Sequence, residues 1–247
     1  MSNNSDELEF NHSSLTPLSF LLFLVAMAVG LLVAVILLPA WLPNLAISLG
    51  GEAPKAYWYL SRGTAFVSLS LLWISMALGL GITNKMARSW PGAPAAFAIH
   101  EYVSLLGLAF AAFHALVLMG DHYINFTLIQ IIIPFGAVDY RPFWVGLGQV
   151  GFYTWAIVAF SFYIRQHIGH KSWRFIHYAS FLMYLIALLH GLTSGTDTSL
   201  PWAQVYYWIS ASSLIFLLVY RIVAPLLDRF FPPRKVSAPQ SRPTQGG

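Results

Sequence analysis

The feature that most constrains this chain is a series of apolar runs, each long enough to cross a bilayer as a helix. About 20 such residues cover roughly 30 Å of hydrocarbon. With 57% hydrophobic and only 9% charged residues, the composition predicts an integral membrane protein, because soluble domains carry about a quarter charged residues. We therefore predict an all-α membrane protein, a six-transmembrane-helix bundle whose spans are Pro17–Leu38, Tyr57–Ile82, Ala95–Met119, Phe143–Ile164, Arg174–Leu192 and Ala203–Val223.

The remaining segments are polar or short. Residues 1–16 are polar and acidic and predict a disordered N-terminus, and residues 225–247, rich in Pro, Ser, Gln and basic residues, predict a disordered tail. The six-span domain occupies residues 17–224 between them. Residues 120–142 form the longest connection, and its apolar run FTLIQIIIPF has only ten residues, so we expect it to be interfacial or re-entrant.

Lysine and arginine are distributed unevenly between the two sides of the predicted bundle. Six spans place both termini on one side, and that side carries ten basic residues against three on the other. Because cytoplasmic loops are enriched in Lys and Arg, we expect both termini in the cytoplasm and the protein in the plasma or inner membrane. This asymmetry accounts for the net charge of +4 without nucleic acid, and the absence of cysteine excludes disulfides and thiolate metal sites.

Two pairs of histidines lie inside the predicted spans. His100 and His114 belong to the third span, and His177 and His190 belong to the fifth. Ionisable side chains are costly in hydrocarbon and are functional candidates by default. Because the two spans run in the same direction, His100 and His177 share the inner level, and His114 and His190 share the outer level.

The spacing within each span suggests two stacked cofactors. At 1.5 Å per residue, fourteen steps separate the histidines of the third span by about 21 Å, and thirteen steps separate those of the fifth by about 20 Å. These rises suit two flat macrocycles stacked between spans three and five. Paired neutral imidazoles are usual axial ligands of haem iron, and they leave no open position, which suits electron transfer.

The directions in which the two histidines of each span point around the helix axis match less well than their spacing along it. Fourteen steps return to within about 40° of the starting direction, but thirteen steps miss it by about 140°. The fifth span must therefore bend, tighten or carry an irregular turn if both of its histidines face the third span.

Two arginines are candidates for pairing with anionic haem propionates. Arg62 lies just inside the outer end of the second span, and Arg174 precedes His177 by three residues. For Arg174, a role as a basic flank of the span explains its position equally well. Simple solvation or snorkelling explains the other polar candidates, which are His12, Glu101, His122, His167 and His170.

The four histidines, their intervals and the segment WRFIHY at residues 173–178 resemble the ferric reductase-like transmembrane domain family over residues 57–222. This family includes the membrane cores of ferric reductases and NADPH oxidases, and the stand-alone haem subunit of the periplasmic methionine sulfoxide reductase system. The resemblance implies two haem b groups, one between His100 and His177 and the other between His114 and His190. It also implies that the thirteen-step interval is tolerated.

The sequence differs from the larger members of that family. Only 23 residues follow Ala224, and none forms a Gly-rich nucleotide fingerprint, so we expect no FAD- or NADPH-binding domain of its own. The expected function is di-haem transmembrane electron transfer, as an oxidoreductase component without an assigned catalytic residue. The donor would be a separate flavoprotein, a flavin at the inner surface or a quinol. The extracytoplasmic acceptor would be a ferric chelate, O₂ or a partner reductase.

Two alternatives remain open at this stage. The histidines could serve a transporter of Zn²⁺, Cu⁺ or protons without haem, although a direct metal site needs ligands close together, and these lie about 20 Å apart along each helix. The chain could also be a membrane anchor whose haems serve only the assembly of a soluble partner.

The charge asymmetry predicts the sidedness of the C-terminal tail. Because the chain has no cysteine, a single thiol introduced by Ser237→Cys can be labelled without background. An impermeant maleimide should label it only after lysis of whole cells. Labelling of intact cells would reverse the orientation and the direction of electron flow.

Overall fold

The computed structural model describes residues 56–86, 91–121 and 124–230, together with isolated positions between residues 18 and 33. All elements of this part of the chain are helices: α4 (Ala56–Thr83), α5 (Ala93–Leu116), η2 (Val117–Gly120), α6 (Leu128–Ile132), α7 (Pro142–Ser161), α8 (Arg165–Ile168), α9 (His170–Ser194) and α10 (Pro201–Phe230). The predictions for residues 1–16 and 231–247 lie outside the described residues, as do those for His12 and His122.

Five of these helices are long and apolar enough to cross a membrane, namely α4, α5, α7, α9 and α10. They correspond to the second to sixth predicted spans, so a multi-pass, all-helical membrane protein is confirmed for the described residues. The first predicted span, Pro17–Leu38, falls largely outside the described residues, and a count of six spans stays a prediction.

The short apolar run between α5 and α7 does not span, as its length predicts. It forms the five-residue helix α6, which begins with a capping box between Thr127 and Gln130. The side chain of Gln149 on α7 holds this segment in place. Its amide nitrogen donates to the carbonyl oxygens of Gln130 and Ile131 at 2.6 and 2.8 Å, and its oxygen accepts from the backbone N–H of Phe135 at 3.0 Å.

The predicted disordered tail begins at residue 225, and this prediction is wrong for residues 225–230. Helix α10 continues through Pro225 to Phe230. Proline lacks an N–H and its ring crowds the carbonyl four residues earlier, so it usually ends a helix. Transmembrane helices tolerate proline better, because neighbouring groups and local adjustments satisfy the freed carbonyl.

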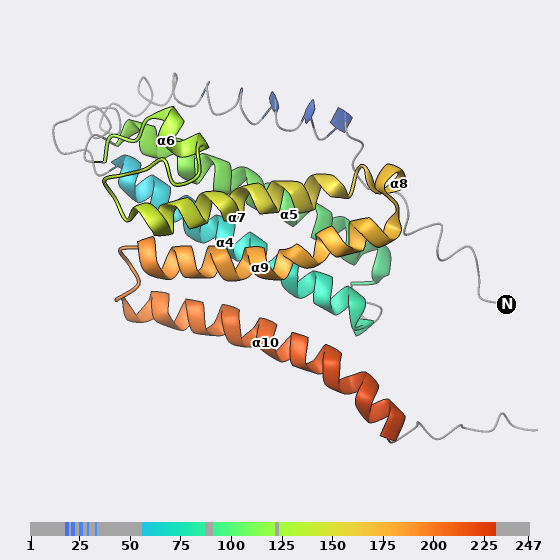
Figure 1. The fold of residues 1–247 in the computed structure, drawn as a ribbon. Coiled ribbons are helices and arrows are strands. Elements are labelled where there is room, and N and C mark those ends of the chain that lie inside the picture. Colours follow the sequence, from blue (N-terminus) through green and yellow to red (C-terminus); the bar gives the residue numbers. More distant parts are fainter. Residues whose placement is uncertain are drawn as a thin grey trace, which may run out of the picture.

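The spanning helices pack in pairs, but α5 and α9 do not pack closely on each other. Helix α4 packs along α5, α7 packs along α9, and α10 packs on α4 at the edge of the bundle (Figure 1). Helices α5 and α9, which carry the four histidines, are not among the closely packed pairs of the described helices. Helix α9 is α-helical throughout His170–Ser194. It therefore contains no irregular turn between its two histidines, although such a turn was one way to direct both of them toward the third span.

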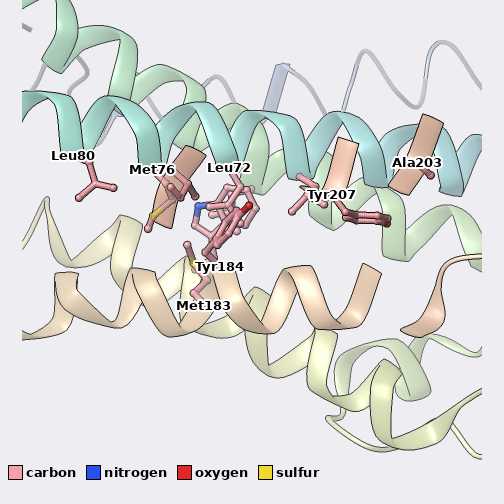
Figure 2. Packing of buried hydrophobic residues seen from close by; sticks show 11 residues of the cluster. Leu72, Met76, Leu80, Met183, Tyr184, Ala203 and Tyr207 are labelled. Carbon is pink, nitrogen blue, oxygen red and sulfur yellow. The ribbon is translucent and has the colours of Figure 1, made fainter. Parts of the chain in front are cut away.

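The apolar core lies where α4, α9 and α10 meet (Figure 2). Leu72 of α4, only 1% exposed, packs with Met183 and Tyr184 of α9 and with Tyr207 of α10. Lipid tails are as apolar as these side chains, so close van der Waals packing, rather than exclusion of water, holds such helices together. The core thereby fixes α9 opposite α4 and α5.

Candidate functional site

The four histidines meet in two pairs. The ring centroids of His100 and His177 are 6.2 Å apart, and those of His114 and His190 are 6.3 Å apart. The rings stand nearly edge-on, with interplanar angles of 70° and 73°. These are the same-level pairs that the sequence predicts, and α9 presents both of its histidines to α5 while remaining one continuous helix.

The separation within each pair fits a metal ion shared by two imidazoles. A metal–nitrogen bond of about 2 Å, with the nitrogen about 1 Å from the ring centre, places two centroids about 6 Å apart across one metal. Aromatic rings in direct contact cover a range of about 4.5–7 Å. The informative observation is therefore that both pairs, about two-thirds of a bilayer apart along their helices, adopt nearly the same separation.

Backbone carbonyl groups orient three of the four rings. Nδ1 lies 2.8 Å from a carbonyl oxygen in each case: His100 from Ser75, His114 from Ser61 and His190 from Trp144. A carbonyl can only accept, so Nδ1 carries the proton and the lone pair of Nε2 is free. Metal-bound histidines almost always donate their other N–H in this way, so the donor set fits an axial haem ligand.

Two serines that the sequence analysis missed support the rings of α5. Ser61 Oγ lies 2.9 Å from Nδ1 of His114, and Ser75 Oγ lies 3.1 Å from Nδ1 of His100. The two serines are fourteen residues apart (75 − 61), as are the two histidines (114 − 100). Because α4 and α5 are antiparallel neighbours, this shared interval was the signal that could have identified the serines.

Each histidine pair lines its own cavity. The predicted outer pair, His114 and His190, lines a mostly apolar cavity of about 390 Å³, and the predicted inner pair, His100 and His177, lines a more polar cavity of about 570 Å³. Both volumes fall in the range of small-molecule and cofactor sites. Open space between α5 and α9 explains why these two helices face each other without packing closely.

Three side chains separate the two cavities. Leu72, Trp155 and Met183 line both of them. Trp155 is buried and donates from Nε1 to Ser104 Oγ at 3.4 Å. Its ring lies so close to Gly107 that a Cβ at that position would be 2.7 Å from it, so the backbone of α5 fixes the position of the indole.

Arg62 has a carboxylate partner within the protein. Its Nε donates to Oδ2 of Asp197 at 2.7 Å, and the second terminal nitrogen contacts Oδ1 in a bidentate ion pair. Asp197 lies in the α9–α10 connection, which folds back over the outer end of α4. Both residues line the outer cavity, so a contact of Arg62 with a propionate stays a prediction, but the arginine already has a carboxylate partner.

Polar side chains gather at the inner cavity. Tyr163 donates to Glu101 Oε1 at 2.9 Å, so Glu101 is hydrogen-bonded rather than simply snorkelling. Burial raises the pKa of Tyr163, which lies beyond the end of α7, and its hydrogen bond to the carboxylate adds to the rise. The ring of Trp173 packs 5.2 Å from that of His177. Its buried Nε1 has no hydrogen-bond partner among the described residues, a donor available to a bound group.

Arg174, the remaining predicted site residue, also lines the inner cavity and donates from Nη2 to Tyr178 Oη at 3.2 Å. Within the described part of the chain, no group of three or more His, Cys, Asp or Glu side chains could hold a metal ion directly. The histidines therefore form two separate pairs. Each pair supplies two protein ligands, which is the number that a bis-histidine haem needs.

Comparisons with family models, with curated proteins and with solved structures find no match to this chain.

Gly148 on α7 positions the outer histidine pair. A Cβ at this residue would lie 2.5 Å from His190 Nδ1, in the place of the ring's hydrogen bond to Trp144. We expect Gly148→Ala to displace the ring and to lower stability by about 1–3 kcal/mol, as overpacking does. Thermal unfolding of the detergent-solubilised protein measures this.

Gly63→Ala is the matched control, because nothing lies within 4 Å of a Cβ at that position of α4. It should leave the unfolding temperature unchanged or raise it, since alanine favours a helix interior over glycine. Equal effects of the two substitutions would show that Gly148 has no special role.

Proposed function

We propose that this chain is a di-haem b-type transmembrane electron-transfer protein, each haem being held by one of the two histidine pairs. The observation that carries the proposal is the near-identical separation of the pairs, 6.2 and 6.3 Å, each beside its own cavity. The resemblance of residues 57–222 to ferric reductase-like domains supports the same function.

The residues of the chain would hold and insulate the two groups. When bound, haem supplies one-electron chemistry at its iron. The carbonyl groups of Ser61, Ser75 and Trp144 would keep the Nδ1 protons in place and so leave Nε2 of their histidines available to the iron. The apolar walls exclude water, and two imidazoles per iron leave no position for a substrate. Such a site favours electron transfer over direct reaction with a ligand.

We propose a donor on the cytoplasmic side, which would be a separate flavoprotein, a flavin or a quinol, and an extracytoplasmic acceptor. A ferric chelate, O₂ and a partner reductase are the acceptor classes that the family resemblance suggests. The rival function, direct transport of metal ions by histidines, is less favoured because no third ligand joins either pair among the described residues.

The proposal predicts two haems per chain. A pyridine haemochrome assay on the purified full chain should give two haem b groups. His177→Ala should remove the inner haem and His190→Ala the outer haem, because each variant breaks one pair. One haem per chain in the unmodified protein would contradict this stoichiometry, and no haem at all would favour the transporter.

The Arg62–Asp197 pair predicts opposite shifts in the potential of the outer haem. A nearby cation favours the reduced, more negative state of the site, and a nearby anion disfavours it. Arg62→Gln leaves the carboxylate uncompensated and should lower the outer midpoint potential by tens of millivolts. Asp197→Asn leaves the guanidinium uncompensated and should raise it.

The double variant Arg62→Gln/Asp197→Asn is the control for this prediction, because it removes both charges and should restore nearly the original potential. Redox titration with optical detection measures all three variants. Shifts of the same sign in the two single variants, or shifts confined to the inner haem, would mean that the pair only ties the α9–α10 connection to α4.

A further inference from the structure

Two arginines from different helices line the inner cavity together with one phenol. Arg174 on α9 donates to Tyr178 Oη at 3.2 Å, and Arg221 belongs to α10. All three side chains line the inner cavity, on the side where α9 faces α10. The site is thus built from two helices rather than from a single basic flank.

Neither guanidinium has a carboxylate partner among the described side chains. Asp197 is bound to Arg62 at the opposite end of the bundle, and Glu101 accepts from Tyr163. Two cations that line one cavity repel each other. An oxyanion between them would replace this repulsion with two charge-assisted hydrogen bonds, which guanidinium forms especially well with phosphate and carboxylate.

The surroundings of this pair are open to the membrane. Tyr178 is 50% exposed, and the neighbouring Phe175 and Ile222 are 79% and 58% exposed. Pro225 lies four residues after Arg221 and cannot donate to its carbonyl. The C-terminal half of α10 runs away from α9 (Figure 1). An amphiphile could therefore place its head between the arginines and its chains along the exposed apolar side chains.

We infer that Arg174, Tyr178 and Arg221 form a binding site for the phosphate of an anionic membrane lipid. Basic pockets between transmembrane helices bind such headgroups. The site needs no haem and goes beyond the proposed function. A carboxylate of the inner haem could offer similar chemistry from inside the cavity. The exposure of Tyr178 and its apolar neighbours favours the lipid, and the experiment separates the two sources.

The test is a titration of the full-length protein, in a neutral detergent, with phosphatidylglycerol, read by native mass spectrometry. Wild type should retain one tightly bound lipid and show no comparable affinity for phosphatidylcholine. Arg174→Gln/Arg221→Gln should weaken phosphatidylglycerol binding by about tenfold or more, because both charge-assisted contacts are lost. The matched control Lys85→Gln/Lys171→Gln removes two exposed charges outside the cavity lining and should stay within about twofold of wild type.

Three results would overturn the inference. Equal weakening in the arginine and lysine variants would mean general surface attraction. Equal binding of phosphatidylcholine by wild type would mean that the phosphate charge is not recognised. Unchanged lipid affinity in the arginine variant with loss of one haem in the pyridine haemochrome assay would assign the arginines to a haem carboxylate. If the double variant does not fold, Tyr178→Phe replaces it: a few-fold weaker binding of phosphatidylglycerol supports the site, and unchanged binding overturns it.

Discussion

The hydrogen bond from a histidine Nδ1 to a main-chain carbonyl is the interaction on which the rest of the site depends. A polar ring in an apolar bundle is costly unless its N–H is satisfied, and the only abundant acceptors there are helix carbonyls with a second lone pair. Such a bond requires two helices to approach closely. Ser61 and Ser75 permit this approach of α4 to α5, and Gly148 permits it between α7 and His190. Helix packing and ring orientation therefore have one common cause.

The same packing explains why the bundle has one cavity at each histidine pair and a layer of large side chains between the two cavities. Helices α5 and α9 are each held by other helices, α4 and α7, so they can face one another across open space. Only at the level of Leu72, Trp155 and Met183 is that space filled. Two separate compartments result from one layer of large side chains. If both were occupied as proposed, the indole of Trp155 would lie between the two groups.

Hydropathy predicted the described spans because helix length and lipid exposure are local properties of sequence. The pairing of the histidines was also predictable, because a level in a membrane follows from counting residues along parallel helices. The partner of Arg62 was not, because Asp197 is 135 residues away and reaches it only through the fold of the α9–α10 connection. Gly148 carries no chemical group that sequence inspection would single out. The continuation of α10 past Pro225 likewise depends on its surroundings, which intrinsic propensity ignores.

The two ends of the bundle differ in their electrostatics, and this difference connects the lipid site with the proposed electron path. At the outer end the charge of Arg62 is neutralised by Asp197, whereas at the inner end Arg174 and Arg221 have no carboxylate among the described side chains. Uncompensated cations would stabilise an electron at the inner site and so oppose its transfer outward. A lipid phosphate bound between the two arginines would cancel one of the two charges and so reduce this bias. In a membrane rich in anionic lipid, the inner end would then carry less positive charge, and outward transfer would work against a weaker attraction.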